Sequence, residues 1–357
     1  MNHSTETSPI ETVFRKQVRK DTRVKNAYLL VHSDRTGLHI NLAEGPGENG
    51  TPHPQQPNYM ASVGKLFTSV IVATLHEKGK LSFEDPIGDY LDSALMDGLH
   101  VHKGKDYSAE IQIRHLLNQT SGLPDNFHPL FDRLLADHDF DIGPREAVEW
   151  AKRNLTPEAA PGGKSHYTDT NYHLLGFIVE KVCGEPFHAV MKKLLFDPVG
   201  MKHAFMLHRS EAEVASPHPE AGFYADETRL NNITGFAGID YAGGSVVAPM
   251  EDLLLFMKAL VGHELVSEET LATMKNDSAR LNPGFDYGYG IWLVRPVPLL
   301  IPEKYRSWGV LGATGAFMFY HPDLDAYLVG NFNHLAWQRK CVRFMFRVMD
   351  KLAAPEA

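Results

Sequence analysis

The sequence predicts a mixed α/β (α+β) fold in which an antiparallel sheet is flanked by helices and carries an inserted, mainly helical domain. Strand-like apolar runs lie near both ends of the chain, at residues 28–32, 38–42, 287–294, 316–320 and 326–331. In the middle of the chain, apolar residues recur at helical spacing and strand-like runs are scarce. We therefore assign residues 1–87 and 236–357 to an α/β sheet domain and residues 88–235 to a mainly helical domain.

Composition is that of a globular protein. The 357 residues, 43% hydrophobic and 22% charged, suit two closely packed domains. The formal net charge of −9 argues against nucleic acid or an anionic membrane as the partner. The first residues show no basic segment followed by an apolar run, and no stretch reaches the ~20 apolar residues of a membrane span. Cys183 and Cys341 lie far apart, so we expect free buried thiols and a cytoplasmic protein.

The N-terminal part is predicted to hold a helix, a pair of strands and a second helix. Ser8 and Pro9 mark a helix start, because serine caps helices and proline is tolerated in the first turn. The first two strand-like runs are joined by a turn-forming segment at residues 34–37. Ser62 then opens a long apolar-periodic segment, for which Gly79 is a plausible end.

The C-terminal part is predicted to return to the sheet. A helix over residues 251–260 leads back to the strand-like runs, and the last two runs flank a turn at residues 321–323. This spacing predicts adjacent antiparallel strands. The final helix presents one apolar stripe, which we expect to pack on the sheet: Cys341, Met345, Val348 and Leu352.

Ser62 and Lys65 are the first candidates for chemistry. Residues three apart on a helix lie on one face, and the N–H groups at a helix start favour an anion beside the serine oxygen. A serine hydroxyl is a weak nucleophile until a base accepts its proton, and lysine can do so only when neutral. Lowering the pKa of a lysine from ~10.4 to ~7 requires roughly 4–5 kcal/mol, to which burial and a positive helix end both contribute. By itself, this pattern also occurs by chance.

Four other segments give the pattern a context: GKLSFEDP at 79–86, IRHLLNQTSGLP at 113–124, PGGKSHYTDTNYHLLG at 161–176 and WGVLGATG at 308–315. With these segments in this order, the chain from about residue 25 to residue 335 resembles the serine β-lactamase and penicillin-binding-protein superfamily. Within the superfamily, it is most similar to the class C β-lactamase-related esterases and D-aminopeptidases. The resemblance implies a β-lactamase-like fold.

The same resemblance implies roles for individual residues. Ser62 would be the acylated nucleophile, Lys65 would take part in its activation, and Tyr167 would belong to the Tyr-x-Asn element. Lys65 and Tyr167 would share one proton, so either could be the base, and we expect Tyr167 to relay the proton to the leaving group. Backbone N–H groups of Ser62 and Ala313 would form the oxyanion hole. The alternative for Tyr167 is an aromatic ring that only packs in the core.

Asp169 departs from the family pattern, which usually has asparagine here. An ionised carboxylate only accepts hydrogen bonds, so we expect it to keep Lys65 protonated and to leave proton acceptance to Tyr167. We also expect it to disfavour acyl groups that need an amide donor. A cap on the following helix is the alternative role.

The third motif departs further. Val310 stands where the superfamily usually has lysine or histidine, and Leu311 where it has threonine or serine. In the alternative register, residues 312–315, Ala313 still supplies no cation. The resemblance implies that this cation helps to bind the carboxylate of penicillin-type substrates, so we expect a neutral acyl substrate here. Trp308, followed by glycine, is similar to a motif of related esterases.

Two further sets of residues have weaker signals. Leu123, Asn126 and Phe127 could line the acyl pocket or simply fill a loop. His100 and His102 form the only tight histidine pair, and no third ligand stands at a suitable spacing, so we expect no metal. The sequence has no phosphate-binding or dinucleotide motif, and we expect no cofactor.

The sequence therefore predicts a serine hydrolase: a carboxylesterase that acts on neutral esters through an acyl-enzyme on Ser62. A D-amino-acid amidase or peptidase, or an acyltransferase, is the alternative, followed by a β-lactamase. The rival from another class is a catalytically retired binding protein, against which the intact Ser62, Lys65 and Tyr167 argue. The expected partner is a small-molecule ester or amide, and the oligomeric state is left open.

Overall fold

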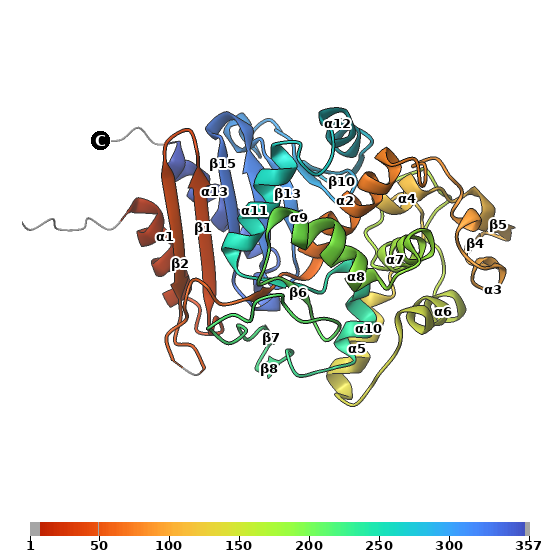
Figure 1. The fold of residues 1–357 in the computed structure, drawn as a ribbon, viewed down its shortest axis with the longest axis horizontal. Helices are drawn as coiled ribbons and strands as arrows, with labels where there is room; N and C mark the ends of the chain where they lie inside the picture. Colours follow the sequence, from red (N-terminus) through yellow and green to blue (C-terminus); the bar gives the residue numbers. More distant parts are fainter. Residues whose placement is uncertain (1–7, 49, 354–357) are drawn as a thin grey trace, which may run out of the picture.

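The computed structural model describes residues 8–48 and 50–353 and is built around one antiparallel sheet (Figure 1). Among these residues the sheet has eight strands in the order β10-β11-β12-β13-β14-β15-β1-β2. They are β1 (Ala27–Ser33), β2 (Leu38–Glu44), β10 (Ala279–Asn282), β11 (Phe285–Tyr287), β12 (Trp292–Val294), β13 (Trp308–Leu311), β14 (Phe317–His321) and β15 (Ala326–Asn331). Leu30 of β1 is opposite Val329 of β15, so the two ends of the chain meet inside the sheet.

Helices cover the sheet and dominate the middle of the chain (Figure 1). They are α1 (Pro9–Arg19), α2 (Gly64–Glu77), α3 (Ser93–Met96), α4 (Ile113–Leu117), α5 (Phe127–Ala136), α6 (Pro144–Asn154), α7 (Thr170–Cys183), α8 (Phe187–Met191), α9 (Asp197–Val199), α10 (Phe236–Asp240), α11 (Met250–Val261), α12 (Glu268–Asn276) and α13 (Lys340–Leu352). No helix in the described ranges is long and apolar enough to cross a membrane.

Alternate residues of β1 show how the sheet is covered. Leu29 and Val31 belong to the apolar cluster that includes α1 and α13. Tyr28 and Leu30 belong to the larger cluster that includes α2 and α11. Because successive strand residues point to opposite faces, helices lie on both faces of the sheet and the central strands are buried.

The region between α2 and α11 is mainly helical and includes several two- and three-residue strands. These are β4 (Val101–His102), β5 (Lys105–Asp106), β6 (Phe205–Met206), β7 (Tyr224–Ala225), β8 (Thr228–Arg229) and β9 (Val246–Ala248). β9 also pairs with β3 (Asn58–Tyr59), a two-residue strand that precedes α2. The larger apolar cluster runs without a break from Leu30 through Leu66 of α2 to Leu117 and Leu175 of this region. The sheet and the helical region therefore share one core, while the domain borders stay a prediction.

Several local expectations are confirmed. The Ser8 hydroxyl accepts hydrogen bonds from the first turn of α1, and Pro9 is the first helical residue. β1 and β2 pair across the predicted turn, as do β14 and β15. The C-terminal stripe packs on the sheet, although Leu352 at its end is only half-buried.

Other expectations need correction. The strand-like run 287–294 is two strands, because Gly288 and Gly290 interrupt it and Gly290 has a φ of 69°. The nucleophile segment does not begin as an α-helix at Ser62, since residues 61–63 form a 3₁₀ turn and α2 begins at Gly64. Both cysteines are free, but Cys183 is half-buried rather than buried.

Candidate active site

Ser62 lies in a strained turn at the start of α2. Ala61 has a φ of 49°, a left-handed conformation that costs a non-glycine residue of the order of 1–3 kcal/mol. The first residue of α2, Gly64, packs so closely on Gly244 that an added Cβ would lie 2.3 Å from the Gly244 carbonyl oxygen. The turn therefore holds Ser62 between the sheet and the loop at residues 241–245.

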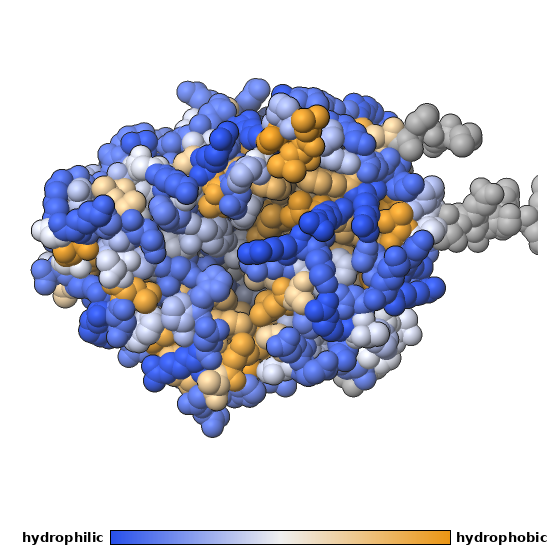
Figure 2. All heavy atoms as spheres, turned by 180° about the vertical axis from the view of Figure 1, so that it is seen from behind, coloured by the Kyte–Doolittle hydropathy of each residue, from blue (hydrophilic) through white to orange (hydrophobic). Residues whose placement is uncertain are grey.

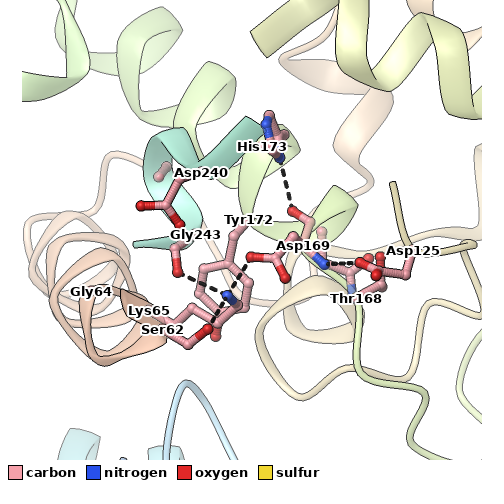
Figure 3. A network of polar contacts seen from close by, with 12 residues as sticks. Ser62, Gly64, Lys65, Asp125, Thr168, Asp169, Tyr172, His173, Asp240 and Gly243 are labelled. Atoms are coloured by element: carbon pink, nitrogen blue, oxygen red, sulfur yellow. Dashed lines mark hydrogen bonds and ion pairs between the residues drawn. The ribbon is translucent and has the colours of Figure 1, made fainter. Parts of the chain in front are cut away.

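Lys65 is fully buried directly behind Ser62 (Figure 3). Its Nζ donates to Ser62 Oγ at 3.1 Å, to Asp169 Oδ1 at 2.5 Å and to the Gly243 carbonyl at 2.8 Å. An ammonium group has three protons, and all three have an acceptor here. The geometry thus fits a charged lysine whose hydrogen bond orients the serine oxygen.

The charges agree with this geometry. Burial acts to lower the pKa of Lys65, but Asp169, together with Tyr167, outweighs burial and raises it above the usual lysine value. Burial raises the pKa of Asp169, which Lys65 offsets only in part. Asp169 precedes α7 but makes no capping hydrogen bond with its side chain, so the alternative role as a helix cap is wrong. Its carboxylate faces Lys65 instead.

Tyr167 completes the group. Its ring lies 5.1 Å from Lys65 Nζ and packs edge-on against Tyr287. Burial raises the pKa of Tyr167, Lys65 and Ser62 act to lower it, and Asp169 raises it further. Asp169 thus keeps Lys65 charged but also opposes ionisation of the phenol. We expected Asp169 to shift proton acceptance from Lys65 to Tyr167. That expectation considered only the effect of Asp169 on Lys65, whereas Asp169 and burial also favour the neutral phenol of Tyr167.

Ala313 lies opposite Ser62, in the turn after β13. A Cβ on Gly312 would lie 2.5 Å from the Met60 carbonyl oxygen, so only glycine allows this turn to approach the serine turn so closely. Ala313 N–H has no backbone partner within residues 8–48 and 50–353. Ser62 and Ala313 line the same cavities, while their role as a pair of oxyanion donors stays a prediction.

Two cavities open beside Ser62, and both are also lined by Tyr167 and Ala313. The inner pocket spans about 490 Å³, part of which is open to solvent, and is walled largely by aromatic rings, with Asp169 and Asp240 among its lining residues. Those rings are Tyr59, Phe127, Phe131, Phe223 and Phe236. The outer groove spans about 1620 Å³, much of it open to solvent, and is lined by Phe285, Trp292 and Leu311 and by two arginines of the C-terminal region. The rear face in Figure 2 shows hydrophobic side chains around a hollow, with hydrophilic ones projecting over it.

Not every predicted substrate-binding residue reaches these cavities. Phe127 lines the inner pocket and Leu311 the outer groove. Trp308 and Val310 line neither, because alternation along β13 directs them into the core, where Val310 is fully buried. Position 310 carries no cationic side chain, as predicted, but the Val310 side chain does not line either cavity. Asn126 is also fully buried, and its side-chain amide has no hydrogen-bond partner in the described ranges.

The structure adds residues that the sequence analysis missed. Asp240 and Thr314 line the inner pocket, and the buried Thr314 hydroxyl lacks a partner among the residues described. His128 lines both cavities and pairs with Asp125, which raises the pKa of His128 despite partial burial. Thr314 stands in the quoted segment 308–315 but was assigned no role, whereas no motif marks Asp240 or His128, which the fold alone brings to the serine. The described residues contain no group of three potential metal ligands.

A serine that contacts a buried lysine, beside a tyrosine, is an arrangement found in serine hydrolases that form an acyl-enzyme. The family model described as Beta-lactamase matches residues 20–347. The chain therefore belongs to the beta-lactamase family, which groups serine hydrolases with penicillin-binding proteins.

Known relatives support the family and the fold. A penicillin-binding protein of Bacillus subtilis (strain 168) is 28% identical over 251 residues, covering 67% of this chain and 52% of the relative. The chain matches about half the length of such curated relatives. A D-amino acid amidase from Ochrobactrum anthropi SV3 aligns with a TM-score of 0.79 and 21% identity, covering 96% of this chain and 99% of that one. EstCE1, a hydrolase with promiscuous acyltransferase activity, aligns with a TM-score of 0.77 and 17% identity, covering 97% of each chain.

Proposed function

We propose that the protein is a serine carboxylesterase that hydrolyses neutral esters through an acyl-enzyme on Ser62. The observation that carries the proposal is the buried Lys65, whose three protons are held by Ser62, Asp169 and Gly243. A retired site would not need to keep a buried charge in contact with a serine, since burying an ion costs several kcal/mol unless it is paired.

In the proposed reaction, Ser62 Oγ attacks the ester carbonyl carbon. The serine proton passes to Tyr167 Oη as Tyr167 gives its own proton to the leaving alcohol oxygen, so the phenol ends neutral. This relay fits the raised pKa of Tyr167, because burial disfavours a free phenolate. The carbonyl oxygen, negatively charged in the tetrahedral intermediate, accepts from the N–H groups of Ser62 and Ala313. Water then attacks the acyl-enzyme, and the same relay returns the proton to Ser62.

The proposed substrate is a small neutral ester whose acyl group enters the aromatic inner pocket. Two carboxylates, Asp169 and Asp240, line this pocket and would repel a carboxylate beside the reacting bond. The larger outer groove offers room for the alcohol part of the ester. The structural likeness to EstCE1, a hydrolase with promiscuous acyltransferase activity, is in keeping with acyl transfer on this fold.

A specific observation favours one second candidate, an amidase for amino-acid amides. The inner pocket combines aromatic walls with two carboxylates, Asp169 and Asp240. Carboxylates and aromatic faces both attract an ammonium group, so this pocket could hold the amino group of such a substrate. The structural neighbours named as amidases make this candidate worth testing beside the ester.

The test measures hydrolysis of p-nitrophenyl butyrate, D-phenylalanine amide and a chromogenic cephalosporin by the wild type and by Ser62→Ala. Ester turnover that is lost in the variant, with little turnover of the other two, supports the carboxylesterase. Preferred turnover of the amide supports the second candidate. A wild-type protein that turns over none of the three and forms no adduct with a fluorophosphonate probe at Ser62 contradicts both and supports a binding protein.

A further inference from the structure

A second buried carboxylate, Asp240, lies behind the candidate nucleophile. It ends α10, is 3% exposed and lines the inner pocket with Ser62 and Asp169. Its Oδ2 accepts hydrogen bonds from Tyr59 Oη at 2.8 Å, from Ser245 Oγ at 3.1 Å and from the Ser245 backbone N–H. Three donors on one oxygen show that this side chain has a fixed place.

The segment that follows Asp240 is strained. Tyr241 and Ser245 have φ values of 36° and 63°, in the left-handed region that non-glycine residues avoid. Gly244 has no room for a side chain, because an added Cβ would lie 2.3 Å from Asp240 Oδ1. Such a conformation persists only when other contacts hold it, and the hydrogen bonds from Ser245 to Asp240 tie the two ends of the segment together.

The strained segment contacts the catalytic lysine directly. The Gly243 carbonyl accepts from Lys65 Nζ at 2.8 Å, and the Ala242 carbonyl accepts from Thr68 Oγ1 at 2.7 Å, one turn further along α2. Figure 3 shows Asp240 beside Gly243, on the far side of that carbonyl from Lys65. A Cβ on Gly243 would meet Asp169 Oδ1 at 2.5 Å, so the segment has little freedom to shift.

We propose that Asp240 is a positioning residue for Ser62 and Lys65: it closes the 241–245 segment and so holds the Gly243 carbonyl against the Lys65 ammonium. Its charge also favours the ammonium form of Lys65. The proposal rests on the function proposed above, since it assigns Asp240 to the activation of Ser62. Asp240 itself does not touch the reacting atoms.

The role makes activation of Ser62 dependent on pH. The groups that face Asp240 are Tyr59 from β3, Ser245 before β9, Lys65 from α2, Asp169 before α7 and Arg209 after β6. Burial raises the pKa of Asp240 to about 6, Lys65 acts to lower it and Asp169 to raise it. Below this pH the protonated carboxyl is a weaker acceptor for Ser245, and the segment that orients Lys65 loosens.

The test is the rate at which a fluorophosphonate probe labels Ser62 between pH 5 and pH 8, a readout that needs no knowledge of the substrate. In the wild type we expect the rate to rise through about pH 6. Asp240→Asn keeps the size and shape of the side chain, and we expect labelling at least tenfold slower at pH 7.5, with no rise through pH 6. Its midpoint of thermal unfolding at pH 7.5 should not fall, because the change removes a charge that burial disfavours.

Two further variants complete the test: one is a control, and the other shifts the pKa of Asp240. Asp252→Asn is the matched control: Asp252 is also buried with a raised pKa, but it accepts from His203 N–H away from the site, and we expect wild-type labelling. Tyr59→Phe removes one hydrogen bond that lowers the pKa of Asp240, so the rise in rate should move to higher pH.

Three results would overturn the inference: wild-type labelling of Asp240→Asn, a slower Asp240→Asn that keeps the rise through pH 6, or an unmoved rise in Tyr59→Phe. If the wild type itself is not labelled at Ser62, the proposed function fails instead, so the two failures are distinguishable.

Discussion

Replacing Asp169 by asparagine tests the electrostatic account of the site most directly. The change keeps the shape of the side chain and restores the residue that the family usually has there. It removes one negative charge 2.5 Å from Lys65 Nζ. Because Asp169 acts to raise the pKa of Lys65, of Tyr167 and of Asp240, all three values should fall together.

The size of the effect follows from the geometry. Two unit charges about 4 Å apart interact by about 4 kcal/mol at an effective dielectric constant of about 20. At about 1.4 kcal/mol per pKa unit, this gives a shift on the order of 3 units for Lys65. Breaking a buried ion pair costs about 3–5 kcal/mol when the remaining charge cannot adapt. Here Asp240 remains nearby and the pKa of Lys65 falls, so we expect a smaller loss of stability for Asp169→Asn.

The assay is the pH dependence of fluorophosphonate labelling at Ser62, from pH 5 to pH 10, with thermal unfolding recorded for each variant. A lower pKa increases the share of Tyr167 and Lys65 that is deprotonated, and so able to accept a proton, near neutrality. Each feature of the wild-type profile should therefore move to lower pH in Asp169→Asn, by up to about three units for the feature that reports Lys65. Asp252→Asn, which removes a buried carboxylate elsewhere, should leave the profile in place. A folded Asp169→Asn with an unmoved profile, or one moved to higher pH, refutes this account of the charges.

Four other changes have expected outcomes. Gly243→Ala should slow labelling of Ser62 at least tenfold, because its Cβ would meet Asp169 Oδ1 at 2.5 Å, and circular dichroism should show the fold retained. Glu220→Gln should raise stability at pH 8 by up to about 3 kcal/mol but not at pH 4, as followed by urea unfolding, since burial raises the pKa of Glu220 to about 7 and its ionised form, present above that pH, weakens the fold. Val310→Lys should lower the free energy of unfolding by more than about 3 kcal/mol in the same assay, because the site is fully buried in the apolar core. Arg339→Ala with Arg343→Ala should leave p-nitrophenyl butyrate hydrolysis within twofold of wild type and reduce any turnover of an anionic cephalosporin, because both arginines line the outer groove.

The elements that local patterns encode were predictable from the sequence. Ser8 caps α1 because serine and proline act within one turn of their own position. The β14–β15 pair follows from a short turn between two apolar runs. The Ser62–Lys65 contact was predictable for the same reason, since the two residues are three positions apart. In each case the interacting groups are neighbours in the chain.

Two features were out of reach because they depend on packing between distant segments. Asp240 is 178 positions from Ser62 in the sequence and lies in no motif. The close approach of Gly64 to Gly244 brings it to the site. The orientation of Val310 was equally hidden. Both faces of β13 are largely buried, and a strand with two apolar faces gives no alternation from which to tell which side chains face a ligand.

These features change the reason to expect a neutral substrate. The argument from sequence relied on the missing cation at Val310, a side chain that the structure places in the core. The stronger reason is the charge that is present: one buried ammonium, Lys65, faces two buried carboxylates, Asp169 and Asp240. A carboxylate beside the reacting carbonyl would meet an excess of negative charge above about pH 6, where Asp240 is ionised. A neutral ester meets no such repulsion. Selection against an anionic acyl group should therefore weaken as the pH falls below 6, and in Asp240→Asn it should already be weak above pH 6.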